Sequence, residues 1–456
     1  MLKRISLLLC LTLLPLSFSA QTFNPSDPLV QTYQPKPVPP VKGLMLKRGD
    51  KVAICGDSIT EQRMYSRAIE TYLMACMPDL DLSVRQYGWS GEQAPGFLAR
   101  MTNDCLRFHP TVATTCYGMN DHGYRPYEPS IGDRYKKYST VIAEAFKAHN
   151  VRFVHGSPGC VGKRPNWSKD TNATTEALNK NLCTLRNIGI DIAREENVRF
   201  ADVFWPMLVA GDEAQRRYAT NYAIAGKDGV HPGWAGSFVM AYAFLKSLGL
   251  DGDIGTYTVD VKSGKATASN GHEVLSARDG EIRIRSKRYP FCATGETNSD
   301  NSIRSAMTLI PFNQELNRLM LMAKNASASK YKVTWGAESR SYSAEQLNKG
   351  VNLAADFAVN PFSEAFDKLD KAVAAKQSYE TKQIKQVFHE LGAGKFKSAD
   401  QIKDAEMKEL FALAGPDGKF DFAVLERETE KKRQPLADAI KAAQVPVEHV
   451  ISLQPE

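Results

Sequence analysis

Between residues 50 and 250, short apolar runs alternate with longer stretches whose apolar residues recur at helical spacing. The run Val52-Ala53-Ile54-Cys55 is apolar without interruption, which is typical of a strand buried on both faces of a sheet. Strands that alternate with helices predict right-handed βαβ units, and therefore a parallel sheet covered by helices on both sides. Strands are predicted at residues 51–55, 82–87, 111–116, 152–156 and 198–203, and helices at 62–76, 95–108, 133–149, 174–196 and 233–248.

The pattern changes after residue 250. Polar and apolar residues alternate with a period of two over 256–261, 281–285 and 330–335, which predicts a small antiparallel β-domain. From Pro361 onward the apolar spacing becomes helical, so amphipathic helices that pack onto the preceding domains are expected. The predicted divisions are a leader at 1–20, a Pro-rich lead-in at 21–48, an α/β domain at 49–250, the β-domain at 251–358 and a helical C-terminal region at 359–456.

The first twenty residues have the pattern of a secretory signal peptide. A basic pair at residues 3–4 precedes an apolar run at 5–18, and small residues follow at 19–20. A membrane anchor is the alternative interpretation, but the run is shorter than the roughly 20 residues that a spanning helix needs, and Pro15 interrupts it. We therefore expect an exported protein, periplasmic or extracellular, without a membrane span.

Composition changes this picture only slightly. The 456 residues are 43% hydrophobic and 24% charged, which excludes collagen-like, wholly disordered and disulfide-dense chains. The formal net charge is +7, and removing the two basic residues of the leader leaves +5. So small an excess does not predict binding to nucleic acid.

Seven cysteines follow the leader, so at least one thiol is expected to stay free or to pair between chains. Cys55 and Cys116 end predicted strands and should pack as small apolar side chains. No cluster of Cys and His has zinc spacing, so neither a metal nor another cofactor is expected. The better candidates for disulfide bridges, with no pairing assigned, are Cys76, Cys105, Cys160 and Cys183.

The segment Gly56-Asp57-Ser58-Ile59-Thr60 joins the first predicted strand to a helix. A serine at such a turn lies at the carboxyl edge of a parallel sheet, where these folds place their ligands. The backbone N–H groups that open the helix also favour an anion. An ordinary helix cap would have the same residue types, so this segment alone leaves both interpretations open.

Three further segments fall in order at the same edge of the predicted sheet. They are Gly88-Trp89-Ser90-Gly91, Gly118-Met119-Asn120-Asp121 and Asp228-Gly229-Val230-His231-Pro232. Together, the four segments resemble the four blocks of the SGNH (GDSL) hydrolase superfamily over about residues 49–250. The resemblance implies a flavodoxin-like, three-layer α/β/α hydrolase domain. An exported SGNH enzyme with an added C-terminal region resembles the bacterial secreted carbohydrate esterases that remove acetyl groups from polysaccharides.

The requirements of ester cleavage then suggest a role for each block. Ser58 would be the nucleophile, and it needs a base to take its proton. Histidine commonly serves as that base, and His231 stands in the matching block. Asp228, three residues earlier, would hold the imidazole tautomer and stabilise the imidazolium.

The charge that develops on the carbonyl oxygen requires preorganised donors. By resemblance these are the backbone N–H groups of Ser58 and Gly91 and the side-chain amide of Asn120. Gly91 is preferred to Gly88 because the glycine of the family follows a small residue, here Ser90. Less specific candidates for substrate contacts are Asp57, which could instead brace the turn, His122, which could be a plain loop residue, and Tyr124, Arg125 and Tyr127.

The leading hypothesis is a secreted serine esterase that removes O-acetyl groups from a polysaccharide or oligosaccharide through an acyl-enzyme. The loop after Cys160 is polar, which favours a hydrophilic substrate. The expected partner is thus an acetylated carbohydrate or another small ester. One alternative is an acyl hydrolase of the lysophospholipase or thioesterase type. The other is a glycan-binding or structural module whose function lies in the C-terminal half.

Overall fold

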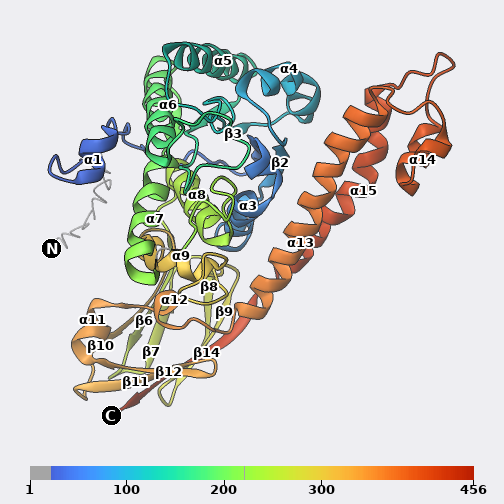
Figure 1. Ribbon diagram of the computed structural model, residues 1–456. Helices are drawn as coiled ribbons and strands as arrows, with labels where there is room; N and C mark the ends of the chain where they lie inside the picture. The colour runs from blue at the N-terminus through green and yellow to red at the C-terminus, as the bar shows by residue number, and fades with distance from the viewer. Residues whose placement is uncertain (1–21, 220) are drawn as a thin grey trace, which may run out of the picture.

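The computed structural model describes residues 22–219 and 221–456, so the predicted signal peptide lies outside the described residues. Figure 1 shows an α/β domain, a β-domain next to it and a long pair of helices, α13 and α15, running beside them. Within the described ranges, no helix has both the length and the apolar character needed to cross a bilayer.

A five-stranded parallel sheet with the order β2-β1-β3-β4-β5 forms the centre of the α/β domain. Its register pairs Gly56 of β1 with Gly88 of β2 and with Cys116 of β3, so these three strands end at the same level. The predicted parallel sheet is confirmed. The strands are β1 (Lys51–Gly56), β2 (Ser83–Gly88), β3 (Val112–Cys116), β4 (Arg152–Gly156) and β5 (Arg199–Ala201).

Helices cover both faces of this sheet. Ala53 and Ile54 are neighbours on β1 and belong to separate cores, because successive side chains of a strand point to opposite faces. The core of Ile54 contains α3 and α8, and the core of Ala53 contains α4 and α5. The helices are α2 (Ser58–Glu61), α3 (Met64–Cys76), α4 (Ala94–Asp104), α5 (Pro129–Ala148), α6 (Thr175–Glu195), α7 (Phe204–Tyr218) and α8 (Trp234–Ser247).

The β-domain contains two sheets, with the orders β13-β10-β6-β7 and β12-β11-β14-β9-β8. Its strand pairs are antiparallel except for β6 and β10, which run parallel. The strands are β6 (Asp253–Asp260), β7 (Lys265–Ala268), β8 (His272–Arg278), β9 (Glu281–Ser286), β10 (Arg318–Lys324), β11 (Lys330–Trp335), β12 (Glu338–Ser343), β13 (Val351–Asn352) and β14 (Val447–Pro455). Four short helices connect them: α9 (Ile303–Leu309), α10 (Phe312–Glu315), α11 (Ala344–Lys349) and α12 (Leu353–Asp356).

The predicted helical C-terminal region is wrong at its end, because β14 is a strand that lies between β11 and β9. His449, Ile451 and Leu453 are buried and alternate with more exposed residues, which is the period of a strand. The helices before it are therefore an insertion in the β-domain, which we call the helical arm (residues 363–443). The arm contains α13 (Ser363–Lys382), a π-helical continuation (Gln383–Leu391), α14 (Ala405–Phe411) and α15 (Phe422–Ala443).

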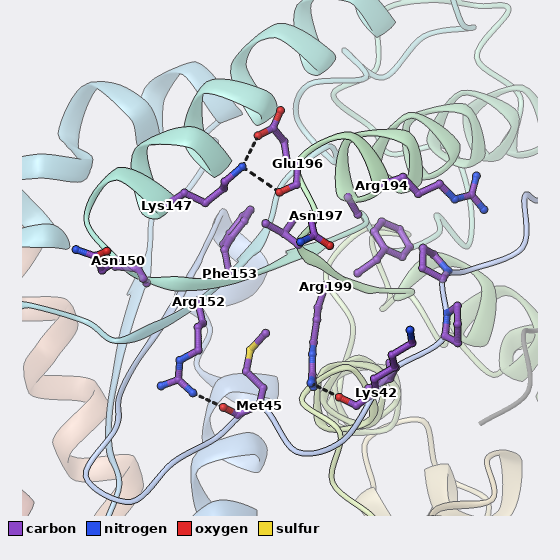
Figure 2. A pocket seen from close by; sticks show the side chains of 17 residues that line it. Lys42, Met45, Lys147, Asn150, Arg152, Phe153, Arg194, Glu196, Asn197 and Arg199 are labelled. Atoms are coloured by element: carbon purple, nitrogen blue, oxygen red, sulfur yellow. Dashed lines mark hydrogen bonds and ion pairs between the residues drawn. The ribbon is translucent and has the colours of Figure 1, made fainter. Parts of the chain in front are cut away.

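The Pro-rich lead-in packs onto the body of the α/β domain, although its sequence shows no packing pattern. It begins with α1 (Pro28–Tyr33), and its backbone carbonyls then accept hydrogen bonds from arginine side chains. Arg186 donates to the carbonyl of Lys36 at 2.9 Å, and Arg199 to that of Lys42 at 2.7 Å. Figure 2 shows Arg199 reaching the lead-in across a pocket of about 840 Å³. These contacts use backbone carbonyls, which every residue has, so they leave no periodic pattern of side chains in the sequence.

All seven described cysteines are buried free thiols, so the suggested bridges among Cys76, Cys105, Cys160 and Cys183 are absent from the described part of the chain. The closest approach is between Cys55 and Cys105, whose Sγ atoms are 3.9 Å apart. Burial raises the pKa of Cys160 to about 12, so this thiol stays protonated and packs as a small apolar group.

A chain of buried hydrogen bonds joins the two sheets of the β-domain. The indole N–H of Trp335 donates to Nδ1 of His449 at 3.1 Å, so the proton of this neutral imidazole is on Nε2, 3.0 Å from Oγ of Ser286. Ser286 in turn lies 2.8 Å from Nδ1 of His272, whose Nε2 contacts the carbonyl of Ile254 at 2.9 Å. The bond from Trp335 exists only while the imidazole of His449 is neutral.

Acid should therefore weaken the β-domain. Burial lowers the pKa of His449 to about 3, so between that pH and the ordinary histidine value of 6.5 the unfolded chain binds the extra proton. The free energy of unfolding falls as the pH falls through this window, by about 3 kcal/mol from pH 6.5 to pH 4 for this residue. We expect His449→Gln to be less stable at pH 7 and its melting temperature to fall less steeply toward pH 4. If the melting temperatures of the variant and the wild type fall equally steeply with pH, the role given to His449 is wrong.

Candidate active site

The first motif segment forms a tight strand-to-helix turn at the carboxyl edge of the sheet. β1 ends at Gly56, and Asp57 caps α2 by accepting the N–H of Ile59 at 3.0 Å. A Cβ on Gly56 would come within 2.1 Å of Oγ1 of Thr60, so the turn needs glycine there. Ser58 is thereby the first residue of α2, with its N–H free of any intrahelical partner.

Ser58, His231 and Asp228 form a hydrogen-bonded chain. Nε2 of His231 lies 2.8 Å from Oγ of Ser58, and Nδ1 of His231 lies 2.7 Å from Oδ2 of Asp228. The other oxygen of Asp228 accepts the N–H groups of Val230 and His231, both at 2.9 Å. Burial opposes ionisation of Asp228, but these donors outweigh it and lower its pKa. An ionised Asp228 holds the proton on Nδ1 and leaves Nε2 to accept the serine proton.

The backbone N–H of Gly91 and the side chain of Asn120 come from the ends of β2 and β3, beside this chain. Gly91 has a φ of +72° and is exposed, with open space where a Cβ would be. Within the described residues, its N–H has no hydrogen-bond partner. Gly88 is different, because a Cβ there would come within 2.1 Å of the Glu61 nitrogen. Gly88 thus serves close packing, and Gly91 offers a free donor.

The amide of Asn120 is held in one orientation. Tyr124 donates its hydroxyl proton to Oδ1 of Asn120 at 3.0 Å, and Nδ2 of Asn120 donates to the carbonyl of Glu92 at 3.1 Å. The same Nδ2 lies 3.4 Å from Oδ2 of Asp57. Tyr124 itself has a φ of +54°, an uncommon conformation for a bulky residue that is often found at functional sites.

Two of the five candidate substrate contacts are inside the protein. Asp57 and His122 are fully buried, and Nδ1 of His122 bonds to the carbonyl of Met119. Burial lowers the pKa of His122 to about 4, so it stays neutral. Both residues support loops and do not face the solvent, since each turn folds its polar side chain back on its own backbone. Arg125 and Tyr127 are exposed.

An exposed tryptophan beside the site was not singled out by sequence reasoning. The side chain of Trp167 is 44% exposed, its ring centroid is 6.0 Å from that of His231, and it packs edge-on against Tyr124 at 5.6 Å. A large aromatic residue within a polar loop was the available signal. In the described ranges, no group of three or more His, Cys, Asp or Glu side chains is arranged to hold a metal ion.

Comparison with known proteins identifies the family of the α/β domain. Residues 54–237 match the model of the GDSL-like Lipase/Acylhydrolase family. The α/β domain belongs to this family. All four motif segments fall within the matched range, and the GDSL domain is accordingly that of an esterase or acylhydrolase.

Solved structures resemble the chain over different lengths. A gut microbial diltiazem-metabolizing enzyme is 21% identical with a TM-score of 0.68, and the match covers 90% of this chain and 98% of that one. An acetylxylan esterase from Geobacillus stearothermophilus (20% identity, TM-score 0.37) matches 45% of this chain and 97% of its own. An alpha/beta hydrolase from the metagenome of Lake Arreo, Spain, is 21% identical with a TM-score of 0.36. That match covers 45% of this chain and 98% of the other. No curated protein matches the sequence. The first likeness shows that the GDSL domain, the β-domain and the arm recur together as one fold.

The buried carboxyl group of Asp57 should make the protein less stable as the pH rises. Burial raises its pKa to about 7, and the nearby Asp121 and Glu92 carboxylates add to the rise. Between the ordinary aspartate value of about 4 and pH 7 the folded state binds the extra proton, so the stability from this group is lost as the pH rises. We expect the melting temperature of Asp57→Asn, relative to the wild type, to increase from pH 5 to pH 8. A difference in melting temperature that stays constant from pH 5 to pH 8 would contradict the raised pKa of Asp57.

Proposed function

We propose that the protein is a secreted serine esterase that removes O-acetyl groups from a polysaccharide or oligosaccharide. The observation that supports the esterase mechanism most directly is the chain Ser58–His231–Asp228, with its two short hydrogen bonds. Export is part of the proposal because of the signal-peptide pattern at residues 1–20.

In the proposed mechanism, each step of an acyl-transfer reaction is assigned to a residue of the site. Ser58 Oγ attacks the acetyl carbon while His231 Nε2 takes its proton, and the carbonyl oxygen becomes an oxyanion. The N–H groups of Ser58 and Gly91 and the amide of Asn120 stabilise that charge. Collapse breaks the ester bond, and His231 returns the proton to the departing sugar hydroxyl. Water then attacks acetyl-Ser58 with His231 as the base, and a second collapse releases acetate and restores Ser58.

The surroundings of His231 favour a carbohydrate as the alcohol part of the ester. Trp167 offers an exposed aromatic face beside the catalytic imidazole, and sugar rings have apolar C–H faces that pack on such surfaces. The loop around it has exposed polar residues, such as Arg164, Asn166 and Lys169. A hydroxyl-rich ligand suits this combination of one aromatic surface with hydrogen-bonding groups.

Ser58→Ala should abolish ester cleavage. Removal of the nucleophile prevents the acyl-enzyme, and a loss of at least about 10³-fold in kcat is expected. The measurement is acetate release from acetylated xylan, acetylated pectin and 4-nitrophenyl acetate. Ser130→Ala, which alters an exposed serine on α5, is the matched control and should be fully active. Activity that survives in Ser58→Ala would refute the mechanism, and a preference for long-chain esters would favour a lipid or thioester substrate.

Trp167→Ala should weaken binding of acetylated oligosaccharides in particular. Loss of an aromatic contact of about 1 kcal/mol corresponds to a five- to tenfold rise in KM. Hydrolysis of ethyl acetate, whose alcohol is too small to span the site, should change less than twofold, and Trp167→Phe should retain most of the oligosaccharide affinity. An equal loss on both substrates would show that Trp167 supports the site and does not select the sugar.

A further inference from the structure

The helical arm contacts the loop that carries Gly91, which we call the Gly91 loop (residues 88–92). The contact is made by the π-helical continuation of α13, the segment Gln383–Leu391. This segment lies outside the family domain at 54–237. π-Helical turns are rare and are frequently found at functional sites. Two residues of this segment, Lys385 and His389, contact side chains that lead to the Gly91 loop.

One link runs from Lys385 on the arm. Its Nζ pairs with Oε1 of Glu61 at 2.7 Å, and Oε2 of Glu61 accepts the backbone N–H of Ser90 at 2.6 Å. Glu61 is the last residue of α2, the helix that begins with Ser58. Burial opposes ionisation of Glu61, but Lys385 and Ser90 outweigh it and lower its pKa. The arm thereby keeps Glu61 ionised and directed at the residue before Gly91.

A second link holds the residue after Gly91. His389 Nε2 contacts Oδ2 of Asp104 at 2.6 Å, and the same oxygen accepts from Arg100 at 3.3 Å. Arg100 makes a two-pronged ion pair with Glu92, with both distances at 2.6 Å. The side chains of Arg100 and Glu92 are only 6% and 5% exposed. Such a pair is strong and directional in a dry environment.

Trp89, at the start of the loop, lies between these two links. The ring of His389 packs edge-on against it at 4.6 Å, and Nζ of Lys385 is 5.1 Å from its ring centroid. Arg100 approaches the same indole at 5.2 Å. The arm therefore contributes two side chains to the surroundings of one tryptophan.

Gly91 has no anchor of its own. It has no side chain, its φ is +72°, and no atom lies within 4 Å of where a Cβ would be. The direction of its N–H therefore depends on the residues on either side, Ser90 and Glu92. The N–H of Glu92 closes the turn on the carbonyl of Trp89 at 3.2 Å, and a series of contacts leads from the arm to each of the two residues.

We propose that the helical arm is a positioning element for the oxyanion hole, with Lys385 and His389 as its positioning residues. The inference rests on the proposed function, because it concerns the donor that Gly91 supplies to the transition state. Without the arm, Glu61 loses its partner Lys385 and Asp104 loses its partner His389, while the Arg100–Glu92 pair stays within the α/β domain. The serine, histidine and aspartate lie outside both links, so substrate binding and the nucleophile itself should be little affected.

The test compares Lys385→Met, which keeps the side-chain stem and removes the charge, with Lys385→Arg. Loss of a complete oxyanion donor lowers kcat by about 10²–10³-fold, so a misaligned one should lower kcat by about tenfold. KM for 4-nitrophenyl acetate should stay within twofold, because the oxyanion exists only in the transition state. Rates are taken per active site titrated with diethyl 4-nitrophenyl phosphate, so that a misfolded fraction does not enter kcat. Lys385→Arg should restore at least half of the wild-type value.

Lys395→Met is the matched control. Lys395 is an exposed residue of the same arm, and its ion pair is with Glu390, away from the Gly91 loop. Its kcat should equal that of the wild type. The inference is overturned if kcat of Lys385→Met equals that of the wild type, or if kcat of Lys395→Met falls as far as that of Lys385→Met. Either result leaves the proposed function intact, provided that the activity of the wild type depends on Ser58. Hydrolysis that persists in the Ser58→Ala variant overturns both the proposed function and the inference.

Glu61→Gln tests the same link if Lys385→Met folds poorly. The glutamine keeps an acceptor for the Ser90 N–H and loses the charge that pairs with Lys385. The single variant should lower kcat several-fold, and the double variant should be no slower than Lys385→Met, since both remove one interaction. If the fall in kcat of the double variant equals the product of the two single falls, the two residues act independently and the link is overturned.

Discussion

The shared level at which β1, β2 and β3 end is the constraint on which the candidate active site depends. Gly56 is in register with Gly88 and with Cys116, so the loops that follow these strands leave the sheet side by side. Ser58, Gly91 and Asn120 are thereby brought together although they are spread along the sequence. A one-step slip in either pairing would move a loop along the strand and turn its side chains to the other face. Parallel pairing of fully buried strands prevents such a slip.

Buried charges fix the arm against the α/β domain. Lys376 of α13 lies between Glu70 of α3 and Glu380, at 2.9 and 2.8 Å, and Arg433 of α15 also pairs with Glu380 at 2.8 Å. These four side chains are 6% exposed or less. Ion pairs in such surroundings add little net stability, because desolvation offsets their attraction. They are strongly directional, however, and an arm shifted by one helical turn would leave several charges unpaired.

The motif segments and the sheet could be predicted from the sequence because both depend on local patterns. The turn at Ser58 depends only on the adjacent Gly56 and on the cap Asp57, and the strands are recognisable in the sequence as apolar runs. The contacts of the arm depend on distant partners: Lys385 and Glu61 are 324 positions apart, and each is an ordinary surface residue by type. The burial of His122 depends on how its loop folds over the sheet. Strand β14 has the alternation of a strand, but it follows a long helix, and its neighbours in the sheet come from far upstream.

The central place of β14 gives the protein an order of assembly. Trp335 on β11 and His449 on β14 are 114 positions apart, and until β14 arrives, β9 and β11 each have an open edge. Open edges of this kind pair readily with other chains. The helical hairpin lies between β12 and β14 in the sequence, so a formed hairpin shortens the effective loop that has to close when β14 joins the sheet. A chain in which β14 is missing or misplaced would therefore expose two strand edges at once, which ties the solubility of the β-domain to a strand far from its neighbours in the sequence.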